Sequence, residues 1–229
     1  MTVGVAVAVA IPVALAALHA TPGAARAGRP SGPAAERAAA RLVTKASTIA
    51  AALDRAGDWG EAITEEEANA WLALDLPRLA AGRLPDWSRS LAVRFHPRRV
   101  ALSGAIGRGP TSARWWTVLA VALEGGNRLV FEVESSGLGL VPLPPGVVLS
   151  AIASAASARG CRAEIGLLEG RPRLHVTLPG RSEGAPTDGS EYHLEGLRID
   201  EGELVIAGST RGPRDGKTRS RPKSPTEHP

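Results

Sequence analysis

The 229-residue sequence contains one cysteine, Cys161, and few signatures of catalytic or cofactor sites. A single thiol cannot form an internal disulfide, so the fold has to depend on its hydrophobic core. We interpret Cys161 as a small hydrophobic residue at the start of a strand rather than as a nucleophile. The sequence has no His-Glu-x-x-His, no Cys-x-x-Cys and no Gly-x-x-x-x-Gly-Lys phosphate loop. We therefore expect no metal and no cofactor.

Two residue pairs remain as candidates for catalysis. His175 and His193 are predicted to lie in adjacent strands near Glu195, where they could bind a metal or transfer protons. Glu132 and Glu134 share one face of a predicted strand, as paired catalytic carboxylates would. Residues of these kinds on the polar face of a strand are usually solvated, so we assign no catalytic residue.

The first 25 residues contain no charged side chain, and the run from Val3 to Ala20 is apolar. That length is near the lower limit of the ~17–25 residues that cross a bilayer. Ala25-Arg26-Ala27 fits the small-residue pattern of a signal-peptide cleavage site, but basic residues follow the run instead of preceding it. We expect residues 1–27 to be a signal peptide or a membrane anchor, which places the protein outside the cytoplasm. The alternatives are a truncated start and a buried helix of a soluble protein.

The net charge of +4 comes from the C-terminal end of the chain. Residues 211–229 carry a balance of +4, whereas residues 28–210 carry −1. The tail combines Pro, Ser, Thr and basic residues without apolar content, which predicts disorder. The body is nearly neutral, so composition gives no support for a specific nucleic-acid partner.

Local patterns predict three helices. After a Gly/Pro/Ala-rich spacer, apolar residues recur every three or four positions between residues 34 and 56, so the range 28–62 is assigned to a spacer and an amphipathic helix. Thr64 and Glu67 form a capping box, which starts a second helix that ends near Asp75. A third helix is expected from about Pro145 to Arg159, with Gly160 as its stop.

From Ser90 onward the apolar period changes from 3.6 to 2, which predicts antiparallel hairpins. The first turns at Pro97-Arg98 and the second at Gly125-Gly126. In the second, a two-residue turn gives the pairs Ala122–Leu129, Ala120–Phe131 and Val118–Val133. The opposite face of the first strand is then half apolar, and we expect a helix, a partner or a lipid-like ligand to cover it.

A second β block is predicted over residues 163–178 and 197–206, following the third helix. We therefore expect residues 63–210 to form an α+β domain. It has a curved, mostly antiparallel sheet of about eight strands, packed by an N-terminal helix pair and one central helix.

Several segments of the chain together resemble a known family. They are the capping-box segment ITEEEANAWL (63–72), the strand VALSG (100–104), and the segment LVFEV (129–133), which leads to LVPLP (140–144) and a helix. The chain is similar to YpmS-like anchored bacterial extracytoplasmic proteins over about residues 63–206, with Ala68 where that family usually has leucine. These proteins are distant relatives of tubular lipid-binding proteins. The resemblance implies an anchored, non-enzymatic domain that holds an acyl chain between helix and curved sheet.

Our first hypothesis is thus a membrane-anchored domain that binds a lipid or another apolar ligand in a groove between the sheet and the helix after Pro145. The expected lining residues are Trp115, Leu119, Val121, Phe131, Leu149 and Ile152. A second hypothesis is a structural partner of an envelope complex, in which another protein covers the apolar face. A third is a hydrolase that uses Glu132 and Glu134 or the two histidines.

Overall fold

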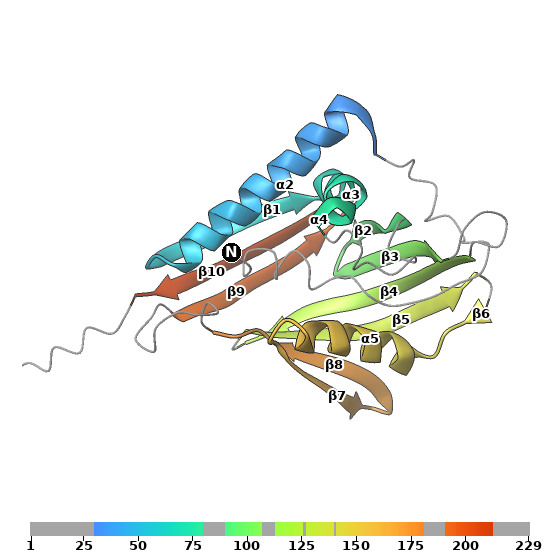
Figure 1. Ribbon diagram of the computed structural model, residues 1–229. Coiled ribbons are helices and arrows are strands. Elements are labelled where there is room, and N and C mark those ends of the chain that lie inside the picture. Colours follow the sequence, from blue (N-terminus) through green and yellow to red (C-terminus); the bar gives the residue numbers. More distant parts are fainter. Residues whose placement is uncertain are drawn as a thin grey trace, which may run out of the picture.

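The computed structural model describes residues 30–79, 90–106, 113–125, 127–139, 141–180 and 191–212. The expected signal or anchor segment and nearly all of the basic tail lie outside these ranges. The structure confirms the α+β class: antiparallel sheets are packed by helices (Figure 1). The elements are α2 (Gly32–Leu53), β1 (Gly57–Thr64), α3 (Glu65–Leu74), α4 (Leu76–Leu79), β2 (Ala92–His96), β3 (Arg99–Ile106), β4 (Ala113–Glu124), β5 (Arg128–Leu138), β6 (Val141–Pro142), α5 (Pro145–Ser157), β7 (Arg162–Leu168), β8 (Arg171–Thr177), β9 (Glu191–Asp200) and β10 (Glu203–Arg211).

The three predicted helices form where the local signals place them. In the capping box of α3, the Glu67 amide donates to Thr64 Oγ1 at 3.2 Å, and the Thr64 amide donates to Glu67 Oε2 at 3.1 Å. Gly160 follows α5 with a φ of 77°, a left-handed conformation that glycine adopts without strain. The capping box and Gly160 are local signals, so the sequence alone locates these two helix ends. The first helix, however, ends at Leu53 instead of near residue 56, and the four-residue helix α4 was not expected.

Strand β1 was not expected, because it begins at Gly57, inside the range assigned to the spacer and first helix. Its sequence, GDWGEAIT, does not alternate clearly between polar and apolar residues, and only Ile63 in it is fully buried. It pairs antiparallel with β10 over its whole length, from Gly57 opposite Thr210 to Thr64 opposite Glu203. The strand is therefore stabilised by a partner almost 150 residues away in the chain.

The strands form two sheets (Figure 1). The smaller sheet has the order β1-β10-β9, and the larger has the order β2-β3-β4-β5-β8-β7, with the two-residue strand β6 beside β5. Helix α2 packs on β1 and β10, whereas α5 packs on β5, β8 and β7. The two N-terminal helices and α5 thus cover different parts of the fold.

The small sheet is joined to the large one through strand β9. The turn of the β2–β3 hairpin meets the β9–β10 hairpin, because the Arg98 amide donates to the Ile199 carbonyl at 2.9 Å and the Gly202 amide to the Phe95 carbonyl at 3.0 Å. The turn of the β4–β5 hairpin meets the other end of β9 through Asn127. This buried side chain donates from Nδ2 to the Tyr192 carbonyl at 2.9 Å and accepts from the Leu194 amide at 2.6 Å.

The register expected for the β4–β5 hairpin is wrong by one residue. Glu124 is paired with Arg128, so three residues connect the strands, and the third, Asn127, has a φ of 60°. A three-residue loop that ends in a left-handed residue is a common hairpin connection. A bulge near Glu134 shifts the register again, so that Leu119 lies opposite Val133 and Val118 opposite Ser135.

This correction changes which residues share a face. Trp115, Leu119 and Val121 lie on the core face of β4, and Val121 is directly opposite Phe131. The expected two-residue turn had paired Phe131 with Ala120 instead, which is on the other face of β4 from these residues. The main reason for expecting a ligand to cover the second face of β4 therefore disappears.

Three tryptophans lie against glycines in the neighbouring strand. The pairs are Trp59–Gly208, Trp115–Gly104 and Trp116–Gly137. A Cβ atom at Gly104 would be 2.6 Å from Nε1 of Trp115, and one at Gly137 would be 2.8 Å from the ring of Trp116. The indole rings thus occupy the space above strand glycines, an arrangement that offsets the poor packing of glycine in a sheet.

Replacing Gly104 with alanine tests this arrangement. Trp115 is only 1% exposed, so its ring cannot move aside for a methyl group. We expect Gly104→Ala to lower the free energy of unfolding by about 1–3 kcal/mol, the usual cost of overpacking a core. Urea unfolding followed by tryptophan fluorescence measures the change.

Gly146 in α5 provides a control, because a Cβ atom there would have nothing within 4 Å. Gly146→Ala should leave stability unchanged or raise it by roughly 0.5–1 kcal/mol, since it removes backbone freedom from the unfolded chain. Equal stabilities of the two variants would show that the ring of Trp115 does not require a glycine.

Candidate apolar binding site

A cavity of about 50 Å³ lies where α2 and α3 meet strands of both sheets. All of its lining side chains are hydrophobic. They are Leu42, Ile63, Ala68, Trp71, Leu72, Leu91, Ala92, Val93, Phe95, Leu102, Trp115 and Leu204. Phe95, Leu102 and Trp115 are buried, whereas Leu72, Leu91 and Ala92 are partly exposed. The cavity therefore has a deep apolar end and a side that is nearer to solvent.

The helical wall of the cavity is fixed by the buried carboxylate of Glu67. Its side chain is 3% exposed and accepts hydrogen bonds from Arg41 Nε at 3.0 Å and Lys45 Nζ at 2.8 Å. Both donors belong to α2, while Glu67 belongs to α3. Lys45 also donates to the Ala62 carbonyl of β1. One carboxylate thus holds α2, α3 and β1 together beside the cavity.

The charge of Glu67 is stabilised in the folded chain. Burial by itself raises the pKa of this carboxyl. The hydrogen bonds from Lys45, the Thr64 amide and Arg41, with the positive charge of Lys45, outweigh that effect and bring the pKa below its ordinary value. Glu67 is therefore ionised at neutral pH and serves a structural role.

A second set of polar contacts fixes α3 to strand β2. Asn69 donates from Nδ2 to the Val93 carbonyl and accepts from the Val93 amide, both at 2.8 Å. The Phe95 amide donates to Glu65 Oε2 at 3.1 Å. These side chains take the place of a neighbouring strand along β2. Val93 and Phe95 line the cavity, so its strand wall is held by directional bonds as well as by packing.

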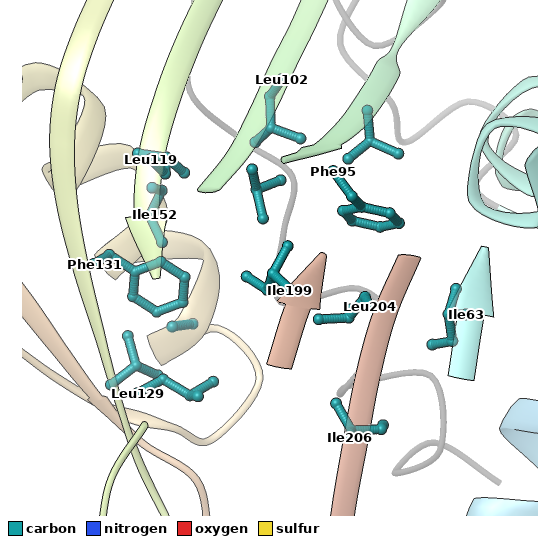
Figure 2. Packing of buried hydrophobic residues seen from close by; sticks show 14 of the residues in the cluster. Ile63, Phe95, Leu102, Leu119, Leu129, Phe131, Ile152, Ile199, Leu204 and Ile206 are labelled. Carbon is teal, nitrogen blue, oxygen red and sulfur yellow. The ribbon is translucent and has the colours of Figure 1, made fainter. Parts of the chain in front are cut away.

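The six residues expected to line a ligand groove lie in the packed core. Trp115 and Leu119 are 1% exposed, Phe131 is 2% exposed, Leu149 is fully buried, Ile152 is 5% exposed and Val121 is partly buried. Figure 2 shows Leu119, Phe131 and Ile152 close together between the sheet and α5. These side chains fill the space between the sheet and α5. Of the six, only Trp115 lines the cavity.

The candidate carboxylates are occupied in separate ion pairs. Glu132 contacts Arg173 at 2.8 Å and Arg171 at 3.6 Å, whereas Glu134 contacts Arg99 at 2.7 Å. Neither faces the cavity. They have the arrangement of cross-strand charge pairs on the outer face of a sheet rather than that of a shared acid and base.

The expectation that His175 and His193 lie in adjacent strands is wrong. His175 is in β8 of the large sheet and His193 is in β9 of the small one. The nearest acidic partner of His175 is Glu124, at 3.7 Å, while Glu195 accepts a hydrogen bond from Ser209. Strands β8 and β9 follow each other in the sequence but belong to different sheets, so the two histidines are not neighbours. Across the part of the chain that the structure describes, no three metal-ligating side chains gather at one point.

Residues 180–184 (GRSEG) match the Gly-x-Ser-x-Gly pattern of many hydrolases. In those enzymes the serine lies on a sharp turn between a strand and a helix. Here strand β8 precedes the pattern and strand β9 is the next described element, while Ser182 itself lies outside the described ranges. The described elements on either side of the pattern are both strands, so they do not provide the strand–turn–helix that positions a nucleophilic serine.

Comparison with known proteins finds no matching family model, no matching curated protein and no matching solved structure. Among the helices of the described ranges, none is long and apolar enough to cross a membrane. The fold and the cavity are therefore the observations from which a function has to be argued.

The low pKa of Glu67 predicts a pH-dependent contribution to stability. Because folding favours the ionised form, this contribution is fully present above the unfolded-state pKa of about 4.3 and is lost as the pH falls through the lower folded-state value. At pH 7, Glu67→Gln should lower the free energy of unfolding by about 1.5–3 kcal/mol. The difference from the wild type should shrink as the pH falls below about 4.

Chemical denaturation at pH 7 and at a series of acidic pH values measures both effects. Glu66→Gln is the control, because Glu66 is in the same helical turn but its side chain is 66% exposed and 3.8 Å from Arg41. It should change stability little. A deficit of Glu67→Gln that stays constant at all pH values would contradict a role for the charge.

Proposed function

We propose that the chain is a non-enzymatic extracytoplasmic domain that binds an apolar ligand, such as a lipid acyl chain, in the cavity between α2, α3 and the two sheets. The supporting observation is the lining, in which all twelve residues are hydrophobic. Enclosed apolar cavities stay free of ordered water and bind apolar molecules. The buried end of this cavity, at Phe95, Leu102 and Trp115, has the same apolar character. The site differs from the groove expected beside α5, because the side chains of α5 fill that space.

The size of the cavity limits what it holds. One water needs roughly 10–15 Å³ on this measure, so about 50 Å³ has room for a few groups of that size. The cavity thus suits the end of an acyl chain, with the rest of the chain lying past Leu72 and Leu91. No charged side chain lines the cavity, so a polar head group would stay outside it.

The cellular setting is part of the proposal. The apolar segment within residues 1–27 would export the domain or anchor it, and the ligand would then come from the cell envelope. The catalytic alternatives have less support, since Glu132 and Glu134 are each held in ion pairs with arginines, and His193 is in a different sheet from His175. A structural partner in an envelope complex is the second candidate function. The exposed side chains of Val141 in β6 and Val147 in α5 favour it.

Filling the cavity tests the proposal. Ala68 lines it from α3, so the ring of Ala68→Phe would occupy the space offered to a ligand. The full chain is titrated with cis-parinaric acid, a fatty acid whose polyene becomes fluorescent when it leaves water. We expect the wild type to bind it. The variant should bind roughly tenfold more weakly, the effect of displacing about two buried methylene groups.

Ala40→Phe is the control, because Ala40 is exposed on α2 and does not line the cavity. It should bind like the wild type. Circular dichroism checks that both variants are folded. The proposal fails if the wild type does not bind the probe, or if Ala68→Phe binds it as tightly as the wild type does.

A further inference from the structure

Most sheet edges in the described structure are blocked. Along β2, Asn69 and Glu65 bond to the backbone where a further strand would pair. Along β9, Asn127 and the Arg98 amide do the same. Strand β1 lies against α2, and Lys45 bonds to its Ala62 carbonyl. Such devices prevent a sheet from adding strands of other chains.

Strand β7 is the exception. It is the last strand of the large sheet and pairs only with β8. Within the described ranges, no side chain bonds to its backbone along the outer edge. Ile165 is 47% exposed, Leu167 is 76% exposed and Leu168 is 49% exposed. An open edge with exposed apolar side chains is unusual in a protein that stays a monomer.

The charged residues of β7 do not protect this edge. Arg162 and Glu164 pair with each other at 2.6 Å, near the start of the strand. Gly166 has no side chain, and the space beside it is open. The segment from Ile165 to Leu168 therefore contains no charge that would repel an approaching strand.

We propose that β7 pairs with β7 of a second copy of this chain, antiparallel and about a twofold axis. A strand edge is matched only by another open edge. In the described structure, β7 is the long edge strand with the most exposed apolar side chains, whereas side chains or backbone amides already bond to part of the outer edges of β1, β2 and β9. The dimer would join two large sheets into one continuous sheet, as isologous contacts do.

The sequence of β7 fits pairing with itself. With Ile165 of both copies at the twofold axis, Ala163 lies opposite Leu167 and Glu164 lies opposite Gly166. Small residues then face large ones, and no two like charges are directly opposite. Ile165 shares a face with the buried Leu174 of β8, so its burial would extend the existing core.

The exposed apolar surface near β7 also suits a dimer. Seven large hydrophobic side chains are exposed among the described residues, and five of them lie between residues 141 and 168. Besides the three in β7 they are Val141 of β6 and Val147 of α5, and α5 packs on β7. Pairing of the two strands would cover the side chains of β7 itself, whereas β6, which carries Val141, pairs with the opposite end of β5 from β8.

The interface is independent of the cavity. The strands of the large sheet that line the cavity are β2, β3 and β4, at the other side of that sheet from β7. The dimer would therefore leave the cavity accessible, and failure of either proposal says nothing against the other.

Cross-linking in the full chain tests the interface. Ile165→Cys places two thiols at the twofold axis, with Cβ atoms ~4.5–5.5 Å apart. A short bis-maleimide reagent should then give a covalent dimer. Val43→Cys is the matched control, because Val43 is 45% exposed on α2 and lies outside the proposed interface. We expect on the order of tenfold more dimer from Ile165→Cys, because pairing raises the effective thiol concentration.

Cys161 does not interfere, because it is buried and burial raises the pKa of its thiol. A second measurement is the sedimentation of Ile165→Lys and Leu167→Lys. Both should sediment as monomers, while the wild type and Val43→Lys sediment as dimers. Equal cross-linking of the two cysteine variants, or a monomeric wild type, overturns the proposal. A monomeric wild type that binds anionic vesicles only while Leu167 is present would assign the surface to a membrane instead.

Discussion

The buried carboxylate of Glu67 is the contact on which the helical half of this fold depends. Glu67 caps the N-terminus of α3 and accepts hydrogen bonds from two cationic side chains of α2, Arg41 and Lys45. Lys45 also donates a hydrogen bond to strand β1. An ionised group this deeply buried is tolerated only when its hydrogen bonds are satisfied, and here they are. Because α2 and α3 are fixed in this way, apolar residues on both helices can line a space that their own side chains do not fill.

The same principle recurs at the sheet edges, where asparagine side chains replace strands. A side-chain amide carries a donor NH2 group beside an acceptor oxygen, so it can bond to the backbone of a single residue or of two nearby residues. Asn69 matches Val93 in β2, and Asn127 joins Tyr192 and Leu194 in β9. The first fixes the wall of the cavity, and the second fixes the small sheet against the large one. Strand β7 lacks such a contact in the described structure. Its open edge and exposed side chains are therefore the basis for proposing that it pairs with a second copy.

Sequence patterns located the helices and most of the strands, because those depend on contacts within a few residues. The capping box of Thr64 and Glu67 is an example in which a four-residue pattern predicted its own hydrogen bonds. The same pattern could not reveal that Glu67 also binds Arg41 and Lys45, since neither spacing nor composition links the two helices. The candidate site was misplaced for a related reason. Leu149 and Ile152 lie on the apolar face of an amphipathic helix. That pattern shows that the face is covered, but it does not show whether the sheet packs directly against it or a groove for a ligand lies between them.

The sequence by itself determined the α+β class, the approximate extents of three helices and the antiparallel hairpins. Periodicity, caps and turn residues act locally and leave few alternatives. The tertiary structure alone decided the register of β4 and β5, the pairing of β1 with β10 and the position of the cavity. The register depended on the left-handed conformation of Asn127 and on a bulge, and each moves side chains between faces. The pairing and the cavity depended on contacts between distant segments, whose strength is the sum of many small packing terms that no local pattern records.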